Sequence, residues 1–161
     1  MKDNLKDVAS KYEGEIFGMH ESGAVHALGV ARACYIIARE QFGMSVEQAK
    51  KAFILGWIHD IGYEFAPTSF EHADAGADVA EIIGFEYADE IRAHERIQDS
   101  FPSDMLDILY MADLLADGAG KFVCAQKRLE DIKTRHPESD GVYKETEKIV
   151  EYLREHGLLE G

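Results

Sequence analysis

Apolar residues recur at the three-to-four-residue spacing of a helix along most of the chain, and this spacing restricts the fold more than any other feature. Alternating β-branched runs are few, and the three prolines, Pro67, Pro102 and Pro137, all fall between periodic segments. We therefore predict an all-α fold. The chain has 161 residues, of which 46% are hydrophobic, and it has no Pro/Gly/Ser-rich linker, so we expect one compact single-domain helical bundle over residues 1–161.

Capping and turn residues predict where the helices begin and end. The first long helix is expected over about Gly23–Phe42, and Ser45 with Gln48 reads as a capping box that opens the second. The second helix should end at His59-Asp60, and a loop is expected over Tyr63–Phe70. The other predicted helices are His72–Ile83, Glu86–His94, Ser103–Ala116, Phe122–Lys133 and Gly141–His156. We expect the sequence motifs described below to lie in a core motif region at about 23–117. We interpret the segment at about 120–157 as helices that pack outside this region.

A net charge of −14 limits the partners that the chain can bind. Binding to a nucleic-acid polymer draws on clustered lysine and arginine, so we expect no such partner. A small phosphorylated substrate, such as a nucleotide, stays compatible, because a metal centre and a few local cations can outweigh the global field at short range. A homodimer is also compatible. The first residues lack the apolar segment of a signal peptide and no later run reaches the length of a membrane span, so we expect a cytoplasmic protein without membrane contact.

The longest apolar run of the chain, Ala52–Gly62, ends in an ionisable pair, His59 and Asp60. Burying such a pair is costly unless a partner or a metal ion compensates it. Asp113 repeats this anomaly, because it lies within Met105–Ala116, a segment that is apolar on almost every side. For one aspartate alone, a helix cap or a salt bridge is the usual explanation. That explanation weakens when several such residues coincide.

His26 opens the apolar face of the first predicted helix. Taken alone, it would more often be a hydrogen-bonded core or surface residue than a ligand. Together with His59, Asp60 and Asp113 it makes a set of two imidazoles and two carboxylates from three separate helices. This mixture of ligands suits Fe, Mn, Co, Ni, Zn or Mg and contains no soft thiolate. We therefore predict a divalent metal site in the interior of the bundle.

The order of these residues resembles that of the HD superfamily of metal-dependent phosphohydrolases, which runs His, then His-Asp, then a distant Asp. Here the pattern is His26, His59-Asp60 and Asp113, and His59-Asp-Ile-Gly62 is similar to the HDIG form of the signature. The resemblance covers roughly residues 26–117. It implies an all-helical fold and a metal ion held by these four residues.

Within that superfamily the chain is most similar to small bacterial proteins that hydrolyse dinucleoside tetraphosphates at a two-metal centre. The similar stretches are His72-Ala-Asp-Ala-Gly-Ala77, Ile91-Arg-Ala-His94 and Tyr110-Met-Ala-Asp113. This likeness makes His72 and His94 candidate ligands of a second metal ion, with Asp60 bridging the two. The chain departs from that group after His94, where it continues Glu95-Arg-Ile-Gln98 instead of Thr and a Gly-Arg-Pro-like stretch. A mononuclear 5′-nucleotidase-like group is the alternative, with Glu64 as its poorly matched extra carboxylate.

The predicted activity is hydrolysis of a phosphate ester or anhydride by a metal-activated water, with His59 and Asp60 as catalytic residues. Arg96 and Lys121 are candidate ligands for a substrate phosphate, although a surface salt bridge or a solvated side chain is the commoner fate of such residues. A catalytically silent module of the same fold, which binds a metal or nucleotide and acts through a partner, is the alternative from a different class.

Five further residues have weaker expectations. Tyr63, Phe65 and Phe70 could form a lid or stack a nucleobase, or could fill the core beneath their loop. His136 and His156 lie in polar surroundings, and we expect them at the surface.

Overall fold

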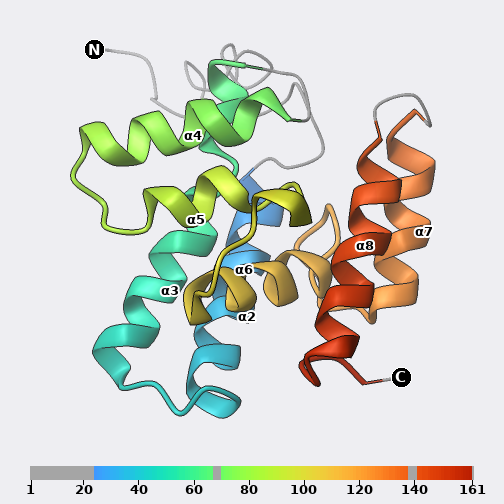
Figure 1. Ribbon diagram of the computed structural model, residues 1–161, viewed down its shortest axis with the longest axis horizontal. Coiled ribbons are helices and arrows are strands. Elements are labelled where there is room, and N and C mark those ends of the chain that lie inside the picture. Colours follow the sequence, from blue (N-terminus) through green and yellow to red (C-terminus); the bar gives the residue numbers. More distant parts are fainter. Residues whose placement is uncertain (1–23, 67–69, 138–140, 161) are drawn as a thin grey trace, which may run out of the picture.

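The computed structural model describes residues 24–66, 70–137 and 141–160, and these residues fold into helices joined by short turns (Figure 1). The elements are α2 (Ala24–Glu40), α3 (Val46–Ile58), the 3-10 helix η1 (Ile61–Glu64), α4 (Glu71–Ile82), α5 (Ala88–Ala93), the 3-10 helix η2 (Ile97–Asp99), α6 (Asp104–Leu114), α7 (Ala125–Arg135) and α8 (Val142–Glu155). Within the described ranges there is no strand, and the only β-type pairing is an isolated bridge between Ala116 and Phe122. The predicted all-α helical bundle is confirmed.

Helix α6 lies in the middle of the molecule and packs against α2, α3, α5 and α8. Its position follows from its sequence, because eight of its eleven residues are buried. Burying one leucine or isoleucine side chain contributes roughly 1.5–3 kcal/mol, so a helix that is apolar on nearly all sides is most stable at the centre. Ser103 caps its first turn by accepting a hydrogen bond from the Leu106 amide at 3.1 Å. Asp113 therefore enters the interior on the last turn of the central helix.

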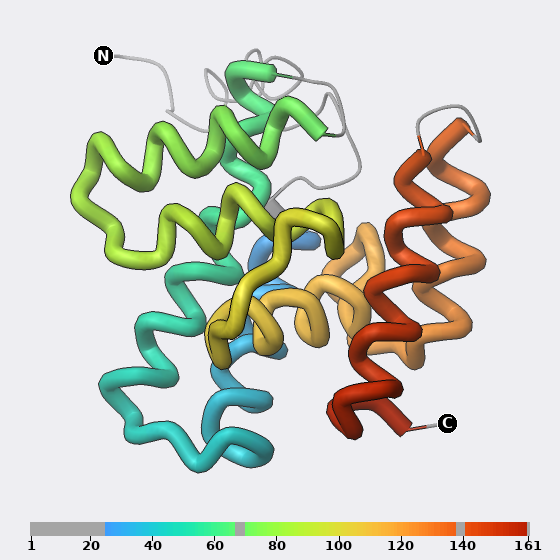
Figure 2. The backbone as a smooth tube through the Cα atoms, viewed as in Figure 1, coloured from blue at the N-terminus to red at the C-terminus, as the bar shows by residue number. Residues whose placement is uncertain are grey.

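The remaining helices lie around α6 in three groups (Figure 2). Helices α2 and α3 pack against each other, and α4 packs against α5 and η1. Helices α7 and α8 form a pair that reaches α6 through α8 and stands apart from α4 and α5 in the view of Figure 1. The chain thus brings the ends of α3, α5 and α6 and the start of α2 to one interior region.

Gly62 permits the close contact between η1 and α4. A Cβ atom on this glycine would overlap the carbonyl oxygen of His72 and would lie 2.6 Å from the amide nitrogen of Gly76. Only a residue without a side chain lets the two backbones approach this closely. The contact places Asp60, at the start of η1, beside His72 in the first turn of α4.

The capping box at the start of α3 is confirmed. The Ser45 hydroxyl accepts from the Gln48 amide at 3.2 Å, and the Ser45 amide donates to Gln48 Oε1 at 3.3 Å. Most predicted helix ends agree with the structure within two residues. Two predictions were wrong: the expected loop at Tyr63–Phe70 begins inside η1, and α7 begins at Ala125 rather than at Phe122. Phe122 pairs with Ala116 in the bridge, which uses the backbone groups that a helix start would need.

Candidate metal centre

The first cluster of the site joins residues from three helices. His26 comes from α2, His59 caps the end of α3, and Asp113 lies in α6. His26 Nε2 lies 2.9 Å and His59 Nε2 lies 3.5 Å from the same oxygen, Asp113 Oδ1. Both imidazoles have no exposed surface. The three side chains can each offer one ligand atom to a common point.

The second cluster lies beside the first and contains Asp60, His72, His94 and Glu95. His72 Nε2 lies 3.0 Å from Asp60 Oδ1, 3.2 Å from His94 Nε2 and 3.2 Å from Glu95 Oε1. His94 Nε2 lies 3.4 Å from Asp60 Oδ1 and 3.3 Å from Glu95 Oε1. Four potential ligand atoms therefore converge in a second small volume.

Asp60 belongs to both clusters because its two carboxylate oxygens face different ways. Oδ1 faces His72 and His94 in the second cluster. Oδ2 lies 3.1 Å from His59 Nε2 and 3.9 Å from His26 Nε2 in the first. One carboxylate is thus placed to bridge two adjacent ions.

Backbone carbonyl groups orient three of the four imidazoles. The Nδ1 atom of His26 donates to the Asp117 carbonyl at 2.8 Å, that of His59 to Gly56 at 2.7 Å and that of His94 to Ile91 at 2.5 Å. A carbonyl oxygen can only accept, so the proton of a neutral ring must sit on Nδ1. Each Nε2 then turns a lone pair toward the carboxylates, which is how metal-binding histidines are commonly held.

His72 is held differently from the other three histidines. The Tyr63 ring stacks on its imidazole at a centroid distance of 3.8 Å. Its buried Nδ1 has no hydrogen-bond partner in the described ranges, and the same is true of His59 Nε2. The unpaired nitrogen of His59 is the one that faces the carboxylates of Asp60 and Asp113, so a ligand that takes an electron pair would explain it.

Electrostatics indicate that the site attracts positive charge. Burial disfavours the charged imidazolium of His59, yet Asp60 and Asp113 outweigh burial and raise its pKa well above the usual value. For His72 burial is likewise outweighed by hydrogen bonds and charge from Asp60 and Glu95, and its pKa rises to about 10. Protons and metal ions compete for such a site, because either one reduces the repulsion between the imidazole and carboxylate lone pairs that face one another.

The carboxylates show the matching shifts. Burial raises the pKa of a carboxyl group, but the imidazoles overcome it at each of the three acids. The pKa of Glu95 falls to about 2 through His72 and His94. The pKa values of Asp60 and Asp113 are lowered well below their usual range, with His59 as the leading opposing charge. All three carboxylates are therefore ionised at neutral pH and available as ligands.

The donor set fits divalent metal ions of borderline or hard character. Four imidazole nitrogens and three carboxylates suit Zn, Fe, Mn, Co or Ni, and the carboxylates also suit Mg. No cysteine joins either cluster within the described residues: Cys34 is buried elsewhere in the core, and Cys124 is exposed. The prediction of a buried group that could hold a metal ion is confirmed.

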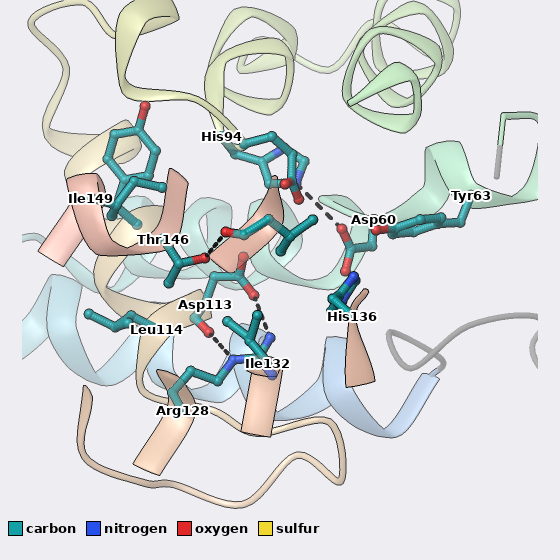
Figure 3. Close-up of a pocket in the computed structure, with 13 residues that line it drawn as sticks. Asp60, Tyr63, His94, Asp113, Leu114, Arg128, Ile132, His136, Thr146 and Ile149 are labelled. Carbon is teal, nitrogen blue, oxygen red and sulfur yellow. Dashed lines mark hydrogen bonds and ion pairs between the residues drawn. The ribbon is translucent and has the colours of Figure 1, made fainter. Parts of the chain in front are cut away.

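A small cavity of about 40 Å³ adjoins both clusters (Figure 3). Its polar lining consists of Asp60, Tyr63, His94, Glu95, Tyr110, Asp113, Arg128, His136 and Thr146, and its apolar lining of Leu114, Ile132, Val142 and Ile149. The lining residues beyond Leu114 come from α7, α8 and the turn after α7. The helix pair at the C-terminal end therefore forms one wall of the candidate site.

The structure brings together all the residues that the sequence predicted as metal ligands: His26, His59, Asp60, His72, His94 and Asp113. It places the two predicted substrate ligands elsewhere. Arg96 pairs with Asp99 at 3.2 Å and lies over the Phe70 ring, and it does not line the cavity. Lys121 is exposed and also lies outside the cavity lining. Their contact with substrate stays a prediction.

Of the residues with weaker expectations, the structure also places some at the cavity and others away from it. Tyr63 lines the cavity and stacks on His72, whereas Phe65 is exposed. Glu64, the extra carboxylate of the mononuclear alternative, is exposed and belongs to neither cluster. His20 and Glu21, two polar residues before the first helix to which we assign no role, lie outside the described residues.

Sequence reasoning missed Glu95, Arg128 and His136. Glu95 follows His94 directly, so its proximity could have been read from the sequence. Arg128 lies four residues before Ile132, on the apolar stripe of α7, which signals a buried arginine. His136 was expected at the surface, but it is half-buried and lines the cavity, where the backbone leaves α7 in an extended conformation.

No protein-family model matches the chain, and searches of curated proteins and of solved structures returned no match. In the described ranges no helix is both long and apolar enough to span a membrane. The function therefore has to be inferred from the chemistry of the two clusters.

Proposed function

We propose that this protein is a metal-dependent phosphohydrolase of the HD type that cleaves a phosphate ester or anhydride of a nucleotide or related small molecule. The position of Asp60, with one oxygen toward each histidine cluster, is the observation that carries the proposal. A shared carboxylate between two nitrogen-rich clusters is the arrangement expected of a two-metal hydrolytic centre.

The two clusters divide the ligands between two ions. His26, His59 and Asp113 would hold one, and His72, His94 and Glu95 the other, with Asp60 shared. Divalent ions bound there would supply an activated water and neutralise the charge that develops on a phosphoryl group.

The protein's own groups prepare this chemistry. Carbonyl groups of Asp117, Gly56 and Ile91 fix three imidazole rings, so the ligand geometry is formed before substrate arrives. The cavity beside Asp60 and Asp113 gives a phosphoryl group access to the centre, and its apolar wall limits the water that can enter. The mononuclear alternative is less well supported, because Glu64 is exposed and belongs to neither cluster.

The test combines metal content with turnover. Protein purified without added metal or a histidine tag should contain about two equivalents of transition metal per chain, and it should hydrolyse members of a panel of nucleotides and phosphate esters. Asp60→Asn keeps the side-chain shape and removes the shared charge, so it should lose metal and turnover together. Asp107→Asn is the matched control, because Asp107 is a half-buried carboxylate that bonds Tyr152 outside both clusters.

Two outcomes would oppose the proposal. Asp60→Asn with parental turnover and metal content would remove Asp60 from the centre. Metal-loaded protein that binds nucleotides but hydrolyses nothing in the panel would favour the alternative of a catalytically silent binding module.

A further inference from the structure

Arg128 reaches from α7 into the wall of the cavity and is almost completely buried, with 4% of its surface exposed. Its Nε donates to the Asp113 carbonyl at 3.2 Å, and its Nη1 donates to Asp131 Oδ2 at 2.8 Å. These two bonds fix the plane of the guanidinium group. Figure 3 shows the side chain directed at Asp113, with Asp60 and His94 farther across the cavity.

The third nitrogen of the guanidinium group is not used in the same way. Nη2 makes no hydrogen bond in the described part of the chain, and its nearest acidic group is Asp113 Oδ1 at 3.8 Å. Nη2 is not a fully buried atom, so its N–H donors are open to a ligand in the cavity that Arg128 lines. The donors that remain lie at the edge of the candidate metal centre.

Charge decides which ligand would be accepted. Asp113 is both the neighbour of Arg128 and a candidate metal ligand, so a bound ion and the guanidinium group would be two positive charges close together. Asp113 and Asp131 compensate these charges in part, and a phosphoryl dianion in the cavity would add to this and offer several oxygens to both the ion and the guanidinium group. A neutral or cationic ligand would add no such compensation.

The size of the cavity restricts the shape of that anion. About 40 Å³ holds only a few water molecules, which corresponds to one phosphoryl group and not to a sugar or a base. Ile132 and Ile149 close its apolar wall. A terminal phosphoryl group has one organic substituent, which can stay outside, whereas a diester would need room for two.

We propose that Arg128 binds the phosphoryl group of the substrate, and that the cavity selects substrates with a terminal phosphate over phosphodiesters and doubly substituted polyphosphates. This inference rests on the proposed function for its substrates. The part that concerns phosphoryl binding by Arg128 can be tested without measuring turnover.

The first experiment measures the affinity of inorganic phosphate for the manganese-loaded full chain by calorimetry. Arg128→Gln should raise the dissociation constant about 10- to 100-fold, the loss expected for a charge-assisted hydrogen bond, while metal content stays unchanged. Arg135→Gln is the matched control. Arg135 bonds the other oxygen of Asp131 from the exposed side of α7, and its removal should leave phosphate affinity within about twofold.

Two results would overturn the role of Arg128. One is parental phosphate affinity in Arg128→Gln. The other is loss of metal together with phosphate, which would mean that Arg128 only supports Asp113. If Arg128→Gln fails to fold, Arg128→Lys keeps the charge without the planar fork, and it should bind metal normally and phosphate more weakly than the parent. Parental affinity in Arg128→Lys would count against recognition by the fork.

The second experiment compares p-nitrophenyl phosphate with bis(p-nitrophenyl) phosphate, which share a leaving group. The parent should prefer the monoester, and Arg128→Gln should lose most of that preference through KM. Equal or better hydrolysis of the diester would overturn the substrate class. If neither these esters nor any member of the nucleotide panel is hydrolysed, but phosphate binding still depends on Arg128, the proposed function fails and the binding inference stands.

Discussion

His59 and Asp60 are neighbours in the sequence, and consecutive side chains of a regular helix diverge by about 100°. Both nevertheless face the same site. His59 still has helical dihedral angles, φ −56° and ψ −31°, whereas Asp60 leaves the helix with φ −101° and ψ 9°. This change of backbone direction turns the Asp60 carboxylate back between the two clusters, so the local end of α3 produces the shared ligand.

Among single residues, Glu95 gives the first testable prediction, because it contacts two histidines of the second cluster. Glu95→Gln removes a charge that lies within 3.3 Å of both His72 Nε2 and His94 Nε2 and keeps the side-chain shape. We expect the second ion to bind about tenfold or more weakly, so that dialysed protein retains about one ion per chain by elemental analysis. Glu90→Gln is the control, since Glu90 is buried but accepts its hydrogen bond from Ser103. Retention of both ions by Glu95→Gln would exclude Glu95 as a ligand.

The titrating groups supply the second prediction, which concerns metal-free protein. The pKa of His72 is raised to about 10 in the folded protein. Its ion pairs therefore stabilise the fold fully below its unfolded pKa, and this stabilisation is lost as pH rises to about 10. The pKa of Glu95 is lowered to about 2 in the folded protein. Its contribution to the stability of the fold is therefore complete above its unfolded pKa and is lost as pH falls to about 2. Urea unfolding should therefore show lower stability at about pH 9.5 than at about pH 6.

Added divalent metal should reverse the alkaline loss, because the ligands bind metal in their deprotonated forms. Metal-free protein that is equally stable at both alkaline and mildly acidic pH would contradict this account of the clusters.

At the scale of elements, the junction of η1 with α4 positions two ligands at once. Gly62→Ala would place a methyl group against the His72 carbonyl oxygen and force the two elements apart. We expect a loss of about 1–3 kcal/mol in the free energy of unfolding, measured by urea titration, together with reduced metal content. Gly76→Ala lies in the same contact, but its added Cβ would come no closer than 3.2 Å to Ile91 Cγ2 and 3.3 Å to the Gly62 amide nitrogen, so it should cost less. Equal effects of the two substitutions would argue against a special role for Gly62.

Helix boundaries were largely predictable from the sequence, because caps and breakers act over a few residues. Ser45 and Gln48 form the expected capping box, since both partners lie within one turn. The start of α7 was not predictable in this way. Phe122 pairs with Ala116, six residues earlier, and a bridge between two chain segments overrides the local helical pattern.

For the whole molecule, the clusters connect the packed helices α2, α3, α4 and α6 and the end of α5. Metal should therefore stabilise the global fold. A concentration about 100 times the dissociation constant would add about 2.7 kcal/mol. For a chain of this size that gain corresponds to a rise in Tm of roughly 5–10 °C, measured by calorimetry with and without a chelator. Asp60→Asn should show a much smaller rise, and an unchanged Tm in the parent would contradict a site that spans the bundle.

The sequence by itself determined the all-α class, most helix boundaries and six metal-ligand candidates. Periodicity and capping are local properties, and His59, Asp60 and Asp113 stand out because charged groups rarely lie among apolar neighbours without compensation. The tertiary structure alone decided how these candidates divide into two clusters, and that Glu95 faces the site while Arg96 pairs with Asp99. It also decided that Arg128, from a helix interpreted only as packing, closes the cavity. A local pattern can indicate that Arg128 is buried, but which site it reaches depends on how distant elements pack.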